Sequence, residues 1–534
     1  MNREANIEAL KKNAFDILVI GGGATGAGVT LDAATRGLKV ALVERDDFSS
    51  GTSSRSTKLI HGGVRYLEQA VKKFDRTQFN LVRDALHERA TLIKIAPHLA
   101  KPLPLVTPLY NWIEVPYYMT GLKMYDWLAG KTNLHPSRFV DTAEALNRFP
   151  MLKKEGLRGG VVYYDGQFDD ARMNVAIALT ASEQGASVAN HVEVTGLLKT
   201  NGKLSGAALR DTITGETWET AAKVIINATG PFSDAIRHMD DPNAPKMLSA
   251  SSGAHVVLDK RFSPPETGLL IPQTEDGRVL FLLPWLGHTL VGTTDNPAEI
   301  ETHPKATEDD IAYILRHVEK YFSIPVSRAD VKAAWSGLRP LVSNINASDT
   351  AKLSRDHVIN ISDAGLLTIT GGKWTTYRKM SLDAVNEAIK LGGLSADESG
   401  TETLKLLGGR NFSSSGAGHL EETYSLDHEV SSYLNRAYGD QAEHVAKLAQ
   451  DGYGARLAEG HAYLEAEVIY GAREEGARST TDILARRTRL AFLDSKGAKQ
   501  AIPRVSALLA KELAWTSDYE AKDAEEARAY IGER

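Results

Sequence analysis

The sequence predicts an α/β protein with three parts: a domain built on a parallel sheet, a mostly antiparallel sheet, and an α-helical C-terminal domain. A strand-helix-strand pattern between residues 15 and 43 predicts the first part. Short apolar runs separated by turns, from about 245 to 345, predict the second, and a charged helical pattern from about 404 onward predicts the third. With 534 residues, the chain has room for two to four domains.

The strand-helix-strand pattern begins with the apolar run 15–20, which is typical of a parallel strand that is buried on both faces. This run ends in the glycine triplet 21–23, and a helix-compatible stretch, 24–36, follows. A second apolar strand, 39–43, ends at Glu44. Residues 1–13 before this unit predict a short polar helix.

The turn after the first strand has the pattern GxGxxG, carried by Gly21, Gly23 and Gly26. The first glycine permits a tight turn, the second lets the backbone approach a pyrophosphate, and the third lets helix and strand pack closely. The helix N-terminus offers free N–H groups to phosphates. Glu44, 23 positions after Gly21, stands where an acid binds a ribose hydroxyl. These features predict dinucleotide binding, and the motif alone leaves NAD and FAD open.

Two later segments favour FAD. Residues 224–230 predict a buried strand that runs into a small-residue turn, and 366–370 predict another strand, followed by Gly371 and Gly372. A helix from about 375 to 391 comes next, and its positive N-terminal end could stabilise an anionic reduced flavin. The alternative is that residues 366–391 form only one more strand-helix unit of a large sheet, with no role at a flavin.

The remaining elements complete the predicted domain organisation. Apolar runs at 160–164, 223–227, 256–258, 279–283 and 289–292 predict strands, with a hairpin turn at 274–277. Residues 408–418, rich in glycine and serine, predict a linker. We therefore expect a Rossmann-like FAD-binding domain in residues 14–100, 155–240 and 350–395, a substrate domain in 101–154 and 241–349, and a helical C-terminal domain in 404–534.

Composition excludes several classes of protein. The 62 Lys+Arg and 68 Asp+Glu residues leave a net charge of −6, and 42% of the residues are hydrophobic, so neither a disordered chain nor a basic nucleic-acid binder is expected. The absence of cysteine excludes disulfides, thiolate nucleophiles, cysteine-ligated metals and a flavin attached through cysteine. Attachment of a flavin through histidine stays open. No secretory h-region and no 18-residue apolar window occur, so a cytoplasmic protein is expected.

Three further features are candidates for a site. Residues 53–67 combine hydroxyl, glycine and basic residues, which suits a loop that wraps a cofactor and offers cations to an anionic substrate, although a solvated loop is equally compatible. His255 and Arg339 lie in the strand-rich middle region. A structural role is the alternative for each of them.

Taken together, residues 21–26, 53–67, 227–230 and 371–378 resemble FAD-dependent glycerol-3-phosphate dehydrogenases over nearly the whole chain. Residues 43–52 and 163–167 are similar to the mitochondrial-type branch. No transit peptide and no D-x-[DN]-x-[DN]-G calcium loop is recognisable, which fits a bacterial enzyme without calcium control.

The resemblance implies oxidation of sn-glycerol 3-phosphate to dihydroxyacetone phosphate, with electrons passing from FAD to membrane quinone. It places His255 and Arg339 at the substrate. Our hypothesis is that His255 is the base, because a neutral imidazole near pH 7 suits proton abstraction, and that Arg339 binds the substrate oxygens. The resemblance also places Arg65, Tyr66 and Lys373 at the substrate, with Arg65 and Lys373 holding phosphate or the reduced flavin. The implied cofactor-binding residues are Gly21, Gly23, Ala24, Thr25, Gly26, Glu44, Arg45, Thr52, Ser53, Ser54, Ser56, Thr57, Leu59, His61, Gly62, Gly63, Ala228, Thr229, Gly230, Gly372, Lys373, Trp374 and Thr375. No metal is implied.

Membrane contact is a further expectation. Aromatic residues crowd the segment 110–127, which also carries Pro104, Pro108 and Pro116 at or near its start: Tyr110, Trp112, Tyr117, Tyr118, Tyr125 and Trp127. Such aromatics mark lipid interfaces, although they also fill cores. With the family resemblance they predict a peripheral protein of the inner (cytoplasmic) membrane. The charge-rich C-terminal helices predict a cover over the substrate domain or an oligomer interface, so a homodimer is possible.

Three alternative functions stay open at this point. A glycerol-3-phosphate oxidase would share the reductive half-reaction but use O2 and make H2O2. A flavin-linked amine or amino-acid oxidase would need a carboxylate site in place of a site for a phosphate dianion. A flavin-binding scaffold or sensor would need no substrate residues at all.

Overall fold

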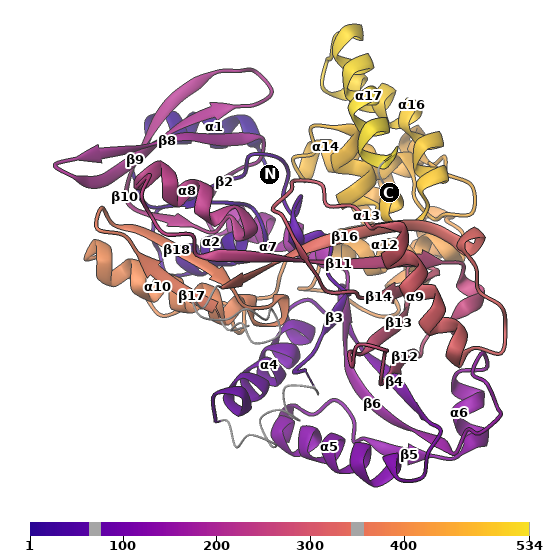
Figure 1. Cartoon of the computed structure of the whole chain (residues 1–534). Coiled ribbons are helices and arrows are strands. Elements are labelled where there is room, and N and C mark those ends of the chain that lie inside the picture. The colour runs from indigo at the N-terminus through magenta and orange to yellow at the C-terminus, as the bar shows by residue number, and fades with distance from the viewer. Residues whose placement is uncertain (64–75, 343–356, 533–534) are drawn as a thin grey trace.

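The computed structural model describes residues 1–63, 76–342 and 357–532. Two sheets and a block of C-terminal helices make up this part of the chain. In Figure 1 the first sheet lies at the left, the second runs from the centre toward the lower right, and the last helices lie at the top. The predicted α/β class with a helical C-terminal part is confirmed.

The first sheet contains the predicted buried strands in the order β17-β18-β10-β1-β2-β7, and its strands from β18 to β7 run parallel. These strands are β1 (Phe15–Ile20), β2 (Val40–Val43), β7 (Ser187–Ala189), β10 (Thr217–Asn227), β17 (His357–Ile361) and β18 (Leu366–Gly371). The antiparallel pair β8 (Val192–Thr200) and β9 (Lys203–Asp211) extends the first half of β10.

Helices cover both faces of the first sheet, which is why its strands are almost entirely apolar. One face shares an apolar core with α2 (Ala24–Thr35), α7 (Asp170–Glu183) and α10 (Tyr377–Gly392). The other face packs against α1 (Arg3–Lys12) and α8 (Ser233–Asp240). The carboxyl ends of β1, β2, β10 and β18 therefore meet at one edge, and the segments that follow them form the wall of a cavity.

The second sheet follows the order β15-β11-β14-β13-β12-β4-β6-β3, with β16 beside β11 and β5 beside β6. Its pairings are antiparallel except for β12 with β4. The strands are β3 (Leu59–Ile60), β4 (Ala100–Leu109), β5 (Arg138–Val140), β6 (Gly159–Phe168), β11 (Leu248–Leu258), β12 (Gly268–Ile271), β13 (Leu280–Trp285), β14 (His288–Gly292), β15 (Asn296–Ala298) and β16 (Val331–Val342). The predicted turn at 274–277 joins β12 to β13, with Gly277 at a φ of +73°.

The strand β6 belongs to the second sheet, where it pairs with β4 over ten residues from Gly159 to Phe168. The predicted division had placed residues 155–240 together with the parallel sheet. The chain crosses from the second sheet to the first directly after β6, since Asp169 caps the helix α7 that packs under the parallel strands. The domain boundaries that the sequence predicts stay predictions.

In the part of the chain that the structure describes, the helices beside the second sheet are α4 (Arg76–Ile95), α5 (Glu114–Ala129), α6 (Thr142–Arg148) and α9 (Glu308–Tyr321). α9 covers the sheet with Ile311, Ile314 and Val318. Short 3₁₀ turns occur at η1 (Thr52–Ser54), η3 (Gly230–Phe232) and η7 (Trp374–Thr376), and each of them borders a cavity described below.

No helix or strand occurs between α10 and the C-terminal helices, which begin with α11 at Gly416. The C-terminal helices are α11 (Gly416–Tyr424), α12 (His428–Tyr438), α13 (Ala442–Leu448), α14 (Glu465–Glu474), α15 (Leu490–Leu493), α16 (Ser495–Glu512) and α17 (Ser517–Gly532). Their core is continuous with the second sheet, because Val257, Trp285 and Trp335 pack into it. The C-terminal part is thus a cover on the second sheet.

Buried ion pairs join the C-terminal part to the first sheet. The π-helical turn Asp482–Arg487 carries Arg486 and Arg487, and both guanidinium groups bind the carboxylate of Asp47, just after β2, at 2.6 Å and 2.8 Å. All three side chains are buried. Removing one partner of such a buried pair leaves an uncompensated charge, so this contact fixes the C-terminal part in place. Across the three described ranges, no helix is both long enough and apolar enough to cross a membrane.

Candidate active site

The glycine-rich turn after β1 brings backbone segments into close contact. Gly21 has a φ of +107°, and a Cβ there would lie 2.8 Å from the carbonyl oxygen of Ala228. A Cβ on Gly26 would lie only 1.8 Å from the Gly21 carbonyl oxygen. Gly26 is therefore required for α2 to start directly against β1, as the motif predicts.

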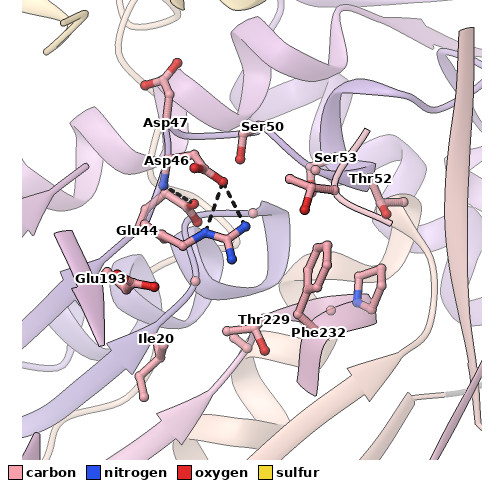
Figure 2. A pocket seen from close by; sticks show the side chains of 18 of the residues that line it. Ile20, Glu44, Asp46, Asp47, Ser50, Thr52, Ser53, Glu193, Thr229 and Phe232 are labelled. Carbon is pink, nitrogen blue, oxygen red and sulfur yellow. Dashed lines mark hydrogen bonds and ion pairs between the residues drawn. The ribbon is translucent and has the colours of Figure 1, made fainter. Parts of the chain in front are cut away.

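A cavity of about 810 Å³ opens at the carboxyl ends of the parallel strands. Figure 2 shows Glu44 and Glu193 at one side of it and Thr52 and Ser53 at the other, with Thr229 and Phe232 near its lower edge. Ligands of open parallel sheets bind at this end of the strands. The predicted cofactor-binding residues that line this first cavity are Gly21, Gly23, Ala24, Thr25, Glu44, Arg45, Thr52, Ser53, Ala228, Thr229, Gly230, Gly372, Lys373 and Trp374.

Glu44 lies at the end of β2, at the cavity wall. Its carboxylate accepts the N–H of Gly22 at 2.6 Å and the N–H of Asp46 at 2.9 Å. Burial, together with the nearby carboxylate of Asp46, raises the pKa of Glu44. A carboxylate has about four acceptor positions, so these two bonds leave capacity for a ribose hydroxyl.

The residues around this cavity fit FAD. The first-turn N–H groups of α2 have no partner within the helix, and Gly23, which precedes the helix, leaves the approach to them open. A Cβ on Gly23 would lie 3.0 Å from Ser53 Oγ, which accepts the N–H of Ala24 at 2.9 Å. These features suit a pyrophosphate, and the cavity extends on both sides of them, since Glu44 and Trp374 also line it.

A second cavity, of about 600 Å³, lies between the first sheet and the second. Thr52, Pro340 and the run from Gly372 to Trp374 line both cavities, so the two adjoin there. The predicted cofactor residues Ser56, Thr57, Leu59, His61, Gly63 and Thr375 line this second cavity and not the first. A solvated loop, the alternative for residues 53–67, is therefore excluded for the described part, 53–63, in which every residue is buried or half-buried.

His255, on β11, lines the second cavity and is 2% exposed. A hydrogen bond of 2.9 Å joins its Nε2 to Thr57 Oγ1. Its ring stacks on Trp335 at a centroid distance of 4.2 Å, because β11 and β16 place the two residues directly opposite each other. Burial holds the pKa of His255 well below its ordinary value, and the nearby Lys58 and Arg339 lower it further. The imidazole is therefore neutral at pH 7 and can accept a proton.

Arg339, on β16, lies on the same side of the sheet as His255 and lines the same cavity. Its guanidinium donates to Asp295 Oδ1 at 3.1 Å and to the carbonyl oxygen of Thr294. A Cβ on Gly253 would lie 2.5 Å from Arg339 Nη2, so a glycine is needed there to make room for the guanidinium. Arg339 keeps 29% of its side chain exposed, enough to reach an anion in the cavity.

The segment after β18 connects the two cavities. Lys373 lines both, and Trp374 donates its indole N–H to the Ser53 carbonyl oxygen at 2.9 Å. Thr375 Oγ1 accepts the N–H of His61 at 3.2 Å. These bonds tie the 53–63 segment to the start of η7 and α10, where a helix N-terminus was predicted at the flavin.

Not every predicted residue lines a cavity. Gly26, Ser54 and Gly62 line neither cavity. The carbonyl oxygen of Ser54 accepts a hydrogen bond from the Lys58 ammonium, and the N–H of Gly62 donates to the Tyr125 hydroxyl. The prediction for Arg65 and Tyr66 lies outside the described residues.

Several cavity residues were not predicted from the sequence. Arg55, Asp165, Gly253, Thr293, Thr294 and Asp295 line the second cavity. Thr294 and Asp295 lie between β14 and β15, and the pairing of β14, β15 and β16 with β11 brings them to Arg339. Among these residues, Gly253 gave a usable signal in the sequence. It lies two positions before His255 in a strand, and an isolated strand glycine marks the close approach of another group to the backbone.

Comparisons with known proteins agree with this geometry. Residues 16–378 match a family described as FAD dependent oxidoreductase, and residues 399–520 match the C-terminal domain of alpha-glycerophosphate oxidase. The chain is 50% identical to the mitochondrial glycerol-3-phosphate dehydrogenase of Bos taurus, over 99% of this chain and 75% of the relative. It is 48% identical to that of Arabidopsis thaliana, over 99% of this chain and 87% of the relative.

A solved structure shares both cavity-forming parts and the C-terminal helices. The glycerol-3-phosphate dehydrogenase of Bacillus halodurans, determined in complex with FAD, superposes with a TM-score of 0.81 at 30% identity, covering 99% of this chain and 97% of the other. The family match spans more than half of the chain, and the sequence relatives match it almost from end to end. The chain therefore belongs to the FAD-dependent glycerol-3-phosphate dehydrogenase family.

Proposed function

We propose that this protein oxidises sn-glycerol 3-phosphate to dihydroxyacetone phosphate and passes the electrons through FAD to a membrane quinone. The observation that carries this proposal is the second cavity, where a neutral buried imidazole, His255, lies with two cations, Arg339 and Lys373, beside the wall shared with the first cavity. When bound, FAD supplies the acceptor for a hydride from the substrate carbon.

The residues of the second cavity supply the base and the cations that the reaction needs. His255 accepts the proton of the substrate C2 hydroxyl as the C–H pair leaves as hydride, so that a carbonyl forms. Arg339, held by Asp295 and the Thr294 carbonyl oxygen, orients the substrate oxygens and stabilises the developing charge. Lys373 and Arg339 together offer the two positive charges that a phosphate dianion needs. The relatives' glycerol-3-phosphate activity supports this assignment.

The decisive experiment is an anaerobic absorption spectrum of the FAD-loaded protein with and without glycerol 3-phosphate. We expect the flavin band to bleach with this substrate and to persist with glycerol or with amino acids. Bleaching by glycerol would show that no phosphate is recognised, and bleaching by amino acids alone would favour an amino-acid oxidase. A flavin that none of these compounds reduces would contradict the proposal.

The acceptor is tested by reoxidising the bleached protein. A quinone-dependent enzyme should recolour rapidly with a soluble quinone analogue and slowly with air. The similarity of residues 399–520 to the C-terminal domain of alpha-glycerophosphate oxidase favours one other candidate, a glycerol-3-phosphate oxidase. Rapid recolouring in air with one H2O2 formed per substrate would establish that candidate instead.

Exposed apolar side chains on α5 and directly before it support contact with a membrane. Trp112 is 59% exposed, Ile113 79% and Trp127 73%, which is unusual for large apolar side chains on one short segment. The same helix lines the second cavity through Tyr117, Tyr118 and Leu122. A lipid-soluble quinone would therefore meet the protein beside the cavity in which the flavin is reduced. On this basis we propose that the protein lies peripherally on the inner (cytoplasmic) membrane.

Not all of the aromatic residues of the segment 110–127 are exposed. Tyr125 is 2% exposed, and its hydroxyl donates to Asp165 at 2.8 Å. Tyr125 is therefore a core residue, whereas Trp112 and Trp127 carry the membrane proposal.

Replacing Trp112, Ile113 and Trp127 together by serine should lower binding to phospholipid vesicles at least tenfold, because full burial of even one large apolar side chain contributes about 1.5–3 kcal/mol and about 1.4 kcal/mol is a factor of ten. Flotation with vesicles of phosphatidylcholine and phosphatidylglycerol measures this. Leu391→Ser is the matched control, since Leu391 is 40% exposed on α10. Equal flotation of the triple variant and the control would contradict a lipid contact at α5.

A further inference from the structure

Lys58 is a fully buried lysine that the proposed reaction does not use; burial lowers its pKa to about 7, against the effect of Asp170, so that it carries its charge below neutral pH. It directly follows Thr57, and its φ of +64° lies in the left-handed region, which is uncommon for a residue other than glycine. Its ammonium group donates to Asp170 Oδ2 at 2.7 Å and to the carbonyl oxygens of Ser54 and Ser56 at 3.0 Å and 2.8 Å. Strained backbone of this kind persists where the surroundings demand it, often beside functional sites.

The ammonium of Lys58 and the imidazole of His255 share one aromatic partner. Lys58 Nζ lies over the indole ring of Trp335, 4.5 Å from its centroid, and His255 stacks on the same ring at 4.2 Å. The preceding residue, Thr57, bonds to Nε2 of His255. Two consecutive side chains of this segment therefore hold the imidazole, one by a hydrogen bond and one through the indole ring.

We propose that Lys58 is a positioning residue for the reaction: through Trp335 and the backbone turn that presents Thr57, it holds His255 in place and opposes protonation of the imidazole. This inference rests on the role of His255 in the proposed function. Lys58 does not line either cavity, so it acts through His255 and not on the substrate.

The charges around His255 agree with this role. The cations that face it are Lys58, from the turn before β3, and Arg339, from β16, and both lower its pKa. Lys58 is paired with Asp170, which also binds Arg489 at 3.4 Å, and Asp169 lies 3.9 Å from that arginine. Arg339 is paired with Asp295, and Lys373 lines the same cavity. Each negative charge is bound to a cation, so no carboxylate is left to favour the imidazolium form among the described residues that face the ring.

The test compares Lys58→Gln with Lys58→Arg. Glutamine keeps N–H donors for the carbonyl oxygens of Ser54 and Ser56 but removes the charge, and arginine keeps the charge at every pH. Removing one of the two cations that lower the pKa of His255 raises that pKa, by an amount on the order of 1 unit. The pH at which anaerobic flavin reduction by glycerol 3-phosphate becomes maximal should therefore move upward by about 1 unit in Lys58→Gln and stay in place in Lys58→Arg. A uniform slowing with an unmoved pH profile in Lys58→Gln would show a structural role only.

A second measurement does not need turnover. In protein labelled with ¹³C in histidine, the His255 resonance, assigned by its loss in His255→Gln, should still be that of a neutral ring in wild type when the pH falls through 6.5. In Lys58→Gln the same resonance should titrate about 1 pH unit higher. Titration of His255 in wild type at or above pH 6.5 would overturn the inference even if the Lys58 variants do not fold. If His255 titrates as expected but glycerol 3-phosphate does not bleach the flavin, the proposed function is overturned instead.

Discussion

His255→Ala is expected to slow anaerobic reduction of the flavin by glycerol 3-phosphate about 10²- to 10⁴-fold, the range that a positioned general base contributes. The imidazole is buried at the cavity wall, bonded to Thr57 and stacked on Trp335, so a solvent base cannot take its place. Stopped-flow absorbance of the flavin band measures the rate. Reduction in the variant at more than one tenth of the wild-type rate would contradict the assignment of His255 as the base.

Controls separate loss of the base from loss of the fold. His419→Ala removes an exposed histidine of α11 and should leave the rate unchanged. FAD content and the thermal midpoint of His255→Ala should be compared with wild type, because the variant leaves a space beside Trp335.

The wild-type rate of flavin reduction should be level from about pH 6.5 to 8. The pKa of His255 is lowered, so the imidazole is already neutral at pH 6.5 and gains nothing as the pH rises. A rate that climbs through pH 7.5 would place the base's pKa too high for His255.

The first cavity could be predicted largely from the sequence because its signals are local. The apolar run 15–20, the turn at Gly21–Gly26 and the second strand that ends at Glu44 are consecutive, and each gives its own pattern. The structure confirms the strands and the helix within one or two residues. What the sequence could not show is that Glu44 already binds the N–H groups of Gly22 and Asp46.

The second cavity depends on contacts between distant parts of the chain. His255 meets Thr57 across 198 residues, and Arg339 meets Asp295 only because β14, β11 and β16 pair in one register. A shift of one residue would turn every side chain of a strand to the other face, and no local pattern fixes that register. The sequence therefore pointed to His255 and Arg339 through family resemblance, whereas Lys58 and Trp335 gave no signal of their own.

The burial of charged and aromatic side chains could not be predicted from the sequence either. Arg486 and Arg487, in a stretch expected as a charge-rich helix, are buried against Asp47 in a π-helical turn. Tyr125 lies in the core, although Trp127, two positions on, is exposed. In both cases the partner is distant in sequence, and the partner decides whether a polar or aromatic side chain is buried.

Gly26→Ala should abolish FAD retention and destabilise the fold by about 3 kcal/mol, the upper part of the range for overpacked sites. The added Cβ would stand 1.8 Å from the Gly21 carbonyl oxygen, and that atom belongs to backbone that cannot rotate away. α2 must then move off β1, which carries its first-turn N–H groups away from the pyrophosphate. The ratio of FAD to protein after purification, together with the thermal midpoint, measures both effects.

A matched glycine shows whether this effect comes from the site or from alanine itself. Gly418 lies in helix α11, and a Cβ there meets nothing within 4 Å. Gly418→Ala should therefore keep full FAD content and raise stability by up to about 1 kcal/mol, because alanine is the better helix former. Full FAD content in Gly26→Ala would mean that α2 and β1 can separate without disturbing the cofactor, and the close contact at Gly21 would then have no part in binding it. Loss of FAD with an unchanged thermal midpoint would instead show that the turn is shaped for the pyrophosphate alone, since the fold would tolerate a separation that the ligand does not.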